Sequence, residues 1–289
     1  MRLLVAVAHY FKPGNGRHGS LSKDPAPRQQ ALMKLVLQLH QLFGEPSVVL
    51  NHQARKIEAV ADGGGNLDIR ICVEEPNHLI DQLTGLSSGF TVVSCKPSDP
   101  LLLGFCCHQV LREAWVEGCA AGTPYDYICY LEDDILITDA DFFLKLRSFN
   151  SAFGDSYLLM PNRIETAENL SQVRRFYIDG NYNPAATVNY RQSAGQMLVF
   201  EHLAEMVRFE QPSNLHSGCF FLNQSQASIY FDAEHSHIID TGFHGPLESA
   251  ATLGMLKTFQ LMKPALSNGR FLTVQHAGRN FMGLVSTLS

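Results

Sequence analysis

The sequence predicts an α/β protein, with a mostly parallel central sheet flanked by helices and built as a single composite domain. In the first half of the chain, short apolar and β-branched runs alternate with amphipathic segments of helical length, which is typical of strand–helix–strand units. The 289 residues are 45% hydrophobic and 17% charged, so the chain is long and apolar enough for a substantial core. We find no repeat and no linker that would separate two independent domains.

The first half supplies most of the predicted sheet. Residues 2–8 read as the first strand, and a loop rich in Gly and Pro leads to a helix that begins near Pro27 and ends at Gly44. A second long helix begins at Pro100 and ends before Gly122. Further strands are expected at residues 47–50, 67–73 and 91–95.

The chain is organised around residues 125–138, where an apolar strand runs directly into Glu132, Asp133 and Asp134. Burying unpaired carboxylates costs several kcal/mol each, so the triplet needs a counter-charge, and no cationic residue adjoins it. A divalent cation is the simplest candidate. Alternation along an extended segment places Glu132 and Asp134 on one side, where they can share one ion. The alternative is a solvated acidic turn between two strands.

The second half begins with a helix for which Thr138 and Asp141 suggest a capping box, and whose apolar stripe includes Phe142 and Phe149. Residues 165–175 are polar and fit a surface helix or a mobile flap, and residues 179–186 read as a loop. Strands are expected at residues 157–161, 196–200, 218–222 and 271–275, and a helix at residues 245–261.

Charge and cysteine content limit the possible functions. A formal charge of −6 without a dense Lys/Arg run argues against nucleic acid as a partner. The seven cysteines are odd in number and form no Cys-x-x-Cys pair, which indicates neither a disulfide framework nor a zinc site. We therefore expect a reducing, cytoplasmic setting. The apolar run of residues 3–8 is too short for a signal peptide or a transmembrane segment.

The apolar strand followed by Glu132-Asp133-Asp134 resembles the metal-binding signature of GT-A-fold glycosyltransferases, family 2-like enzymes that use nucleotide sugars. The resemblance implies a nucleotide-sugar donor, most commonly a UDP-sugar, and a divalent cation, Mn²⁺ or Mg²⁺. It implies that Glu132 and Asp134 hold the metal and that Asp133 reaches the ribose or the sugar. His276, which directly follows an apolar strand, best matches a late histidine ligand, and His235, His237 and His244 compete for that role.

The same resemblance assigns residues 1–138 to the donor-binding half and residues 139–289 to the acceptor-binding half. Candidates for the donor pocket are His9, Tyr10, Arg28 and His108, with Arg112 one helical turn after His108. Arg28 can instead be a solvated charge on its helix, and His108 and Arg112 can instead lie on the surface.

Inverting enzymes of this kind place a carboxylate base near the start of a helix in the acceptor half. Glu248, in Gly-Pro-Leu-Glu, matches that position in part, with Asp240 as the alternative, whereas a retaining enzyme needs neither. Two other functions stay open, a metal-dependent phosphohydrolase and a non-catalytic nucleotide- or sugar-binding protein of the same fold. The sequence identifies neither the sugar nor the acceptor.

Overall fold

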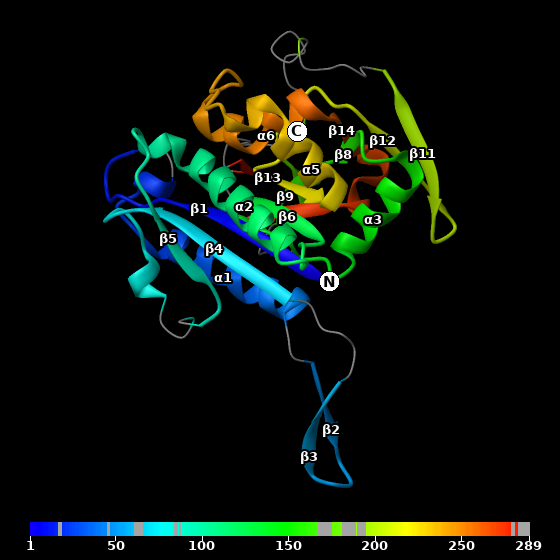
Figure 1. Cartoon of the computed structure of the whole chain (residues 1–289), viewed down its shortest axis with the longest axis horizontal. Coiled ribbons are helices and arrows are strands. Elements are labelled where there is room, and N and C mark those ends of the chain that lie inside the picture. The colour runs from blue at the N-terminus through cyan, green and yellow to red at the C-terminus, as the bar shows by residue number, and fades with distance from the viewer. Residues whose placement is uncertain are drawn as a thin grey trace.

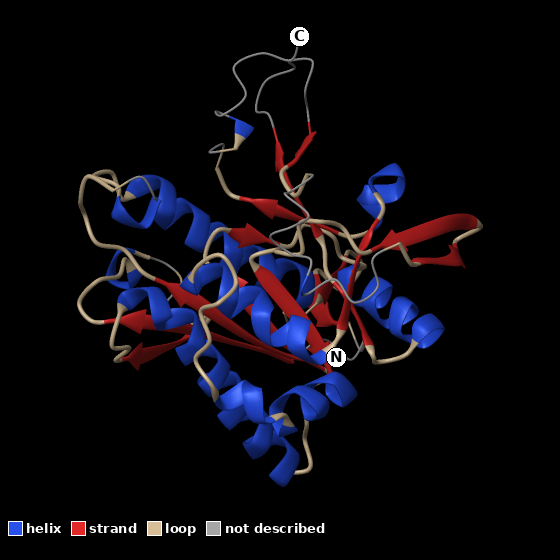
Figure 2. Ribbon diagram, turned by 90° about the horizontal axis from the view of Figure 1, so that it is seen from above, coloured by secondary structure: helices blue, strands red, loops and turns tan. Residues whose placement is uncertain are grey.

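The computed structural model describes residues 1–16, 19–44, 47–60, 66–83, 86, 88–166, 175–180, 189, 195–278 and 281–282. The fold is α/β, as predicted, with helices packed on both sides of the strands (Figures 1 and 2). The polar segment expected at residues 165–175 and the loop expected at 179–186 lie mostly outside the described residues.

A five-stranded sheet forms the centre of the molecule, in the order β13-β6-β1-β4-β5. Pairing is parallel from β6 through β1 and β4 to β5, and β13 joins the edge of β6 antiparallel. The strands are β1 (Arg2–His9), β4 (Asn66–Glu74), β5 (Thr91–Cys95), β6 (Tyr127–Glu132) and β13 (Cys219–Asn223). The predicted half that ends at residue 138 is therefore completed by a strand from the other half.

Helices cover both faces of this sheet. Successive strand residues point to opposite faces, so each strand contributes side chains to both helical layers. Val5 and Val7 of β1 belong to the cluster that contains buried residues of α1 (Ala26–Phe43). Leu4 and Ala6 belong to the cluster on the side of α2 (Leu103–Ala120), where α6 (Pro246–Thr258) also packs. Pro100 opens a short 3-10 turn, Pro100–Leu102, ahead of α2.

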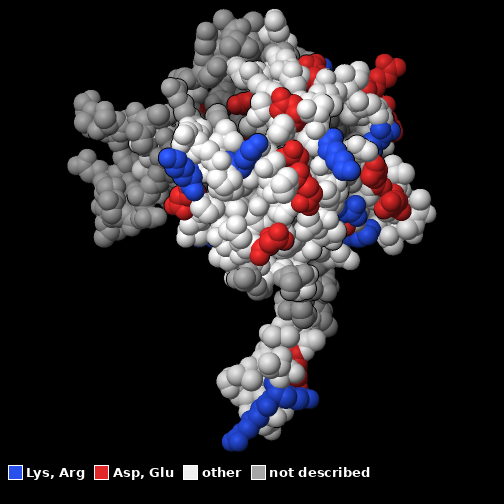
Figure 3. All heavy atoms as spheres, turned by 90° about the vertical axis from the view of Figure 1, so that its left-hand side faces the viewer, with Lys and Arg blue, Asp and Glu red and all other residues white. Residues whose placement is uncertain are grey.

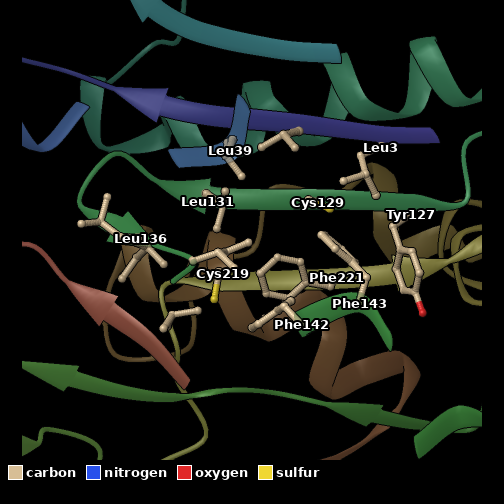
Figure 4. Close-up of a cluster of buried hydrophobic side chains, with 14 of the residues drawn as sticks. Leu3, Leu39, Tyr127, Cys129, Leu131, Leu136, Phe142, Phe143, Cys219 and Phe221 are labelled. Carbon is tan, nitrogen blue, oxygen red and sulfur yellow. The ribbon is translucent and has the colours of Figure 1, made fainter. Parts of the chain in front are cut away.

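The core on the α1 side continues into α3 (Phe142–Phe153), as the predicted aromatic stripe requires. Phe142 and Phe221 meet edge to face, with ring centroids 4.7 Å apart, and in Figure 4 both lie below β1 and β6, with Phe221 on β13. Asp141 precedes the helix, but its side chain makes no capping hydrogen bond, so the capping box expected here is wrong.

Two smaller sheets make the overall strand arrangement mixed, and the predicted mostly parallel arrangement describes only the central strands. One has the order β10-β9-β15-β7, and the other has the order β11-β12-β14-β8. The first contains β10 (Arg175–Tyr177), β9 (Asn162–Thr166), β15 (Thr273–His276) and β7 (Ile135–Leu136). The second contains β11 (Met197–His202), β12 (Glu205–Glu210), β14 (Gln260–Pro264) and β8 (Tyr157–Leu159).

A separate hairpin of β2 (Val48–Asn51) and β3 (Lys56–Ala59) projects away from the body of the molecule (Figure 1). The strand expected at residues 47–50 therefore exists, but it pairs only with β3 among the described strands and joins no central sheet. Among the described helices, α5 (Gln224–Asp232) follows β13 directly. No helix in the described part of the chain is long and apolar enough to cross a membrane.

Candidate functional site

The acidic triplet lies where the order of the central strands changes direction. From β1 the chain adds β4 on one side and later β6 on the other, so the carboxyl ends of β1 and β6 are neighbours. In open α/β sheets this position forms the crevice in which ligands bind. His9 ends β1, and Glu132 ends β6 with Asp133 and Asp134 following it.

Asp133 is fully buried, and its partners are two basic side chains. His9 Nδ1 lies 2.5 Å from Asp133 Oδ2, while His9 Nε2 accepts a hydrogen bond from the Leu79 amide at 3.0 Å. His9 therefore carries its proton on Nδ1 and donates it to Asp133. Arg28 contacts the same carboxylate through Nε, which donates to Oδ2 at 2.9 Å, and through a terminal nitrogen that forms an ion pair with Oδ1.

Arg28 also reaches Asp134, with a terminal nitrogen 2.7 Å from Oδ2. Its side chain is only 19% exposed, so it is the buried counter-charge of the triplet and not a solvated helix-face charge. Burial by itself would lower the pKa of Arg28, but Asp133, Asp134 and Glu132 outweigh it and raise that pKa above its ordinary value. Burial would likewise raise the pKa of Asp134, but Arg28 and His276 bring it below the usual range.

His276 reaches the triplet from the end of β15. Its Nε2 lies 3.7 Å from Asp134 Oδ2, which is too long for a hydrogen bond, and its Nδ1 lies 3.0 Å from Oε1 of the buried Glu165. Glu165 also accepts hydrogen bonds from the amides of Phe281 and Met282, at 3.1 and 2.7 Å. In many metal sites, a carboxylate hydrogen-bonded to one ring nitrogen orients a histidine whose other nitrogen binds the ion.

Glu132 lies near His216 and Gly218. Its Oε1 lies 3.8 Å from His216 Nε2, and its amide donates to the Gly218 carbonyl at 2.9 Å. Gly218 has a φ of +64°, and a Cβ there would lie 2.9 Å from Glu132 Oε2, so this position requires glycine. Burial, reinforced by Asp134, raises the pKa of Glu132 to about 8 despite the opposing charges of Arg163 and Arg28.

A buried ionic cluster lies behind Glu132, and no sequence motif predicted it. Asp179 accepts from Arg163 Nε and from Lys263 Nζ, each at 2.8 Å, and also from the Arg163 amide at 2.9 Å. Lys263 Nζ donates to the His216 carbonyl at 2.7 Å. Burial raises the pKa of Asp179, but the two cations outweigh it and hold that pKa below its ordinary value.

Of the two candidate bases, Glu248 lies nearer the triplet. It is half-buried in the first turn of α6, and its charge is one of those that raise the Glu132 pKa. Asp240 is 41% exposed and lies 2.5 Å from Lys257 Nζ, on the outside of α6. The assignment of either residue as a base stays a prediction.

The other candidates lie elsewhere. His108 is buried between α2 and α6, where Nε2 donates to the Ala250 carbonyl at 2.8 Å and Nδ1 lies 3.0 Å from the Tyr230 hydroxyl. Tyr10 packs against the cluster on the α2 side, where burial, together with the charges of Glu74 and Asp99, raises its pKa. Arg112 and His237 contact each other on the outer surface of α2, and His235 bonds Thr258.

Two side chains of the site, those of Asp134 and His276, offer donor atoms of the kinds that bind a divalent cation. Asp134 Oδ1 is buried without a hydrogen-bond partner, and His276 Nε2 faces the same carboxylate. Within the described ranges, no group of three or more His, Cys, Asp or Glu side chains is arranged to hold a metal. Asp134 and His276 together offer one carboxylate and one imidazole, so an ion held here would need its other ligands from phosphate and water, as Mg²⁺ often does.

Sequence reasoning missed Glu165, Arg163, Asp179, Lys263 and His216. For Lys263 the usable signal was a charged residue inside an apolar run, since it follows Leu261 and Met262 in β14. Such residues are rarely buried unless paired. The sequence of β9, which begins with Asn162 and Arg163, gives no such signal for Glu165.

Comparison with known proteins adds little to this geometry. Neither the family models nor the curated proteins include a match to the chain. Among solved structures, the crystal structure of a 4-diphosphocytidyl-2C-methyl-D-erythritol synthase matches over 93% of this chain and 92% of its own, at 10% identity and a TM-score of 0.34. A likeness at that level carries no functional argument, so the function must be argued from the site.

Proposed function

We propose that this protein is a metal-dependent glycosyltransferase of the GT-A type that moves a sugar from a nucleotide-sugar donor, a UDP-sugar first, to an acceptor hydroxyl. The observation that carries the proposal is the position of Glu132-Asp133-Asp134 at the carboxyl end of β6, beside the end of β1 and facing His276. Ligand crevices of open α/β sheets lie at this point, and the triplet supplies the oxygen ligands that hard cations prefer.

In this proposal, Asp134 and His276 hold the cation, which when bound neutralises charge on the donor diphosphate. Glu165 orients the His276 ring through Nδ1, which would leave Nε2 to bind the cation. Asp133 is held by His9 and Arg28, so its role is to anchor the loop that carries Asp134. A donor contact from Asp133, as expected from the sequence, requires that loop to move.

Glu248 is proposed as the general base. It takes the proton of the acceptor hydroxyl as the new bond to the sugar forms and the bond to the diphosphate breaks. Glu248 lies half-buried in the first turn of α6, and its charge acts on Glu132 of the triplet.

The test is release of nucleoside diphosphate from a panel of nucleotide sugars in Mn²⁺. We expect slow donor hydrolysis by the wild type and its loss in Asp134→Asn. Asp139→Asn is the matched control, because Asp139 pairs with Lys145 outside the site. Release of inorganic phosphate instead indicates the phosphohydrolase, and equal rates in both variants contradict the assignment of Asp134.

A non-catalytic nucleotide- or sugar-binding protein is the second candidate, and one observation favours it. Arg28 pairs with both Asp133 and Asp134 and so supplies a counter-charge from the protein itself. Donor binding that persists in EDTA without any turnover, and that is lost in Arg28→Met, supports this candidate over the transferase.

A further inference from the structure

The β2–β3 hairpin, residues 48–59 and here named the arm, exposes an unusual amount of apolar surface. Val48, Val49 and Leu50 are 54%, 51% and 54% exposed, and Ile57 is 69% exposed. Residues that lie directly opposite each other in the hairpin share a face, so Val48, Leu50 and Ile57 form one apolar face, whereas Val49 lies on the other face beside polar side chains. An isolated two-stranded hairpin is marginally stable in water, and a large exposed apolar surface marks an interaction site.

The two edges of the arm differ. Strand β3 carries Lys56 and Glu58, which form an ion pair at 3.1 Å, and charged side chains on an edge discourage further pairing. Strand β2 reads Val-Val-Leu-Asn and carries no charge. The backbone edge of β2 is therefore the one available to another strand.

Charge and symmetry indicate which strand pairs with the free edge of β2. The arm carries Arg55 and Lys56 against the single acid Glu58, and Figure 3 shows the cations gathered at its far end, whereas the chain as a whole has a formal charge of −6. Two copies related by a two-fold axis bring β2 antiparallel to its own equivalent, which is the pairing that identical edges allow. In that arrangement each cationic tip points toward the acidic body of the other copy.

We propose that the arm is a dimerisation element, in which β2 of one copy pairs with β2 of a second copy to form a four-stranded antiparallel sheet. Val48, Val49 and Leu50 form the centre of this interface. The proposal is independent of the proposed enzymatic function, since the arm pairs with no strand of the central sheet.

The experiment is size-exclusion chromatography with multi-angle light scattering over a wide range of protein concentration. We expect the wild type to show about twice the 32.1 kDa mass of one chain. Val49→Glu and Val49→Lys should each be monomeric, because like charges meet across the axis, and mixing the two variants should restore the doubled mass. Leu144→Glu is the matched control, since Leu144 is 56% exposed on α3, away from the arm, and this variant should remain dimeric.

Circular dichroism of each variant establishes that the body stays folded. A wild type that is monomeric throughout, or a Val49→Glu variant that keeps the doubled mass, overturns the proposal. So does a monomeric wild type that sediments with phosphatidylserine-containing vesicles through the arm, because the apolar surface and cationic tip then serve a membrane contact.

Discussion

Replacing Asp179 by Asn tests the buried ionic cluster behind Glu132. Asp179 lies between Arg163 and Lys263 at 2.8 Å from each, and the three side chains are at most 8% exposed. Asn keeps the shape of the side chain and can still accept from the Arg163 amide, but it leaves both cations without their charged partner. Removing one partner of a buried pair costs about 3–5 kcal/mol.

A loss of that size is a large share of the roughly 5–15 kcal/mol that holds a native protein together. We expect the midpoint of thermal unfolding to fall by on the order of 10 °C, measured by calorimetry or circular dichroism. Asp240→Asn is the matched control, because the Asp240–Lys257 pair is exposed and such pairs contribute about 1 kcal/mol or less.

The double variant Asp179→Asn with Lys263→Met separates charge from packing. It removes one of the two stranded cations, so part of the lost stability should return. An Asp179→Asn variant within about 1 kcal/mol of wild type, or a double variant no more stable than the single one, would refute the reasoning.

Three further predictions concern single residues. Burial lowers the pKa of His108 to about 4, so the unfolded chain binds the extra proton between that value and about 6.5. The contribution of His108 to the free energy of unfolding is therefore complete above about pH 6.5 and falls by about 3 kcal/mol as the pH drops to 4. Urea unfolding should find this loss reduced in His108→Gln and unchanged in the control His52→Gln. Glu165→Gln should raise the Mn²⁺ concentration needed for half-maximal donor hydrolysis by about 10–100-fold, and an unchanged titration would remove Glu165 from the site. Glu248→Gln should slow sugar transfer by about 10²-fold or more with donor affinity preserved in calorimetry, whereas Asp240→Asn should transfer at the wild-type rate; the reverse pattern would exchange their roles.

The sequence predicts correctly the elements in which burial of one face or of the whole element imposes a regular spacing of apolar residues. The strand before Glu132 and the stripe of α3 are apolar with the period of their structure, and both form as expected. The same logic failed for Val48–Asn51, because an apolar strand in a projecting hairpin has the same local pattern as one in a core.

The site likewise has one part that the sequence predicts and another that it does not. A triplet at a strand end requires a counter-charge, and that requirement follows from the sequence alone. The sequence does not identify Arg28 as that counter-charge. Arg28 and Asp133 are 105 positions apart, so their pairing depends on how α1 packs beside β6. The pairing of Asp179 with Lys263, 84 positions apart, depends equally on tertiary structure.

The most direct test of the proposed site is a crystal structure with Mn²⁺ and UDP, with anomalous diffraction recorded to locate the manganese. The account predicts an anomalous peak bound by Asp134 and His276 Nε2, about 2.0–2.2 Å from each ligand atom, with diphosphate oxygens completing the coordination. Manganese bound elsewhere, or UDP bound without metal while Arg28 still pairs with Asp133 and Asp134, would contradict it.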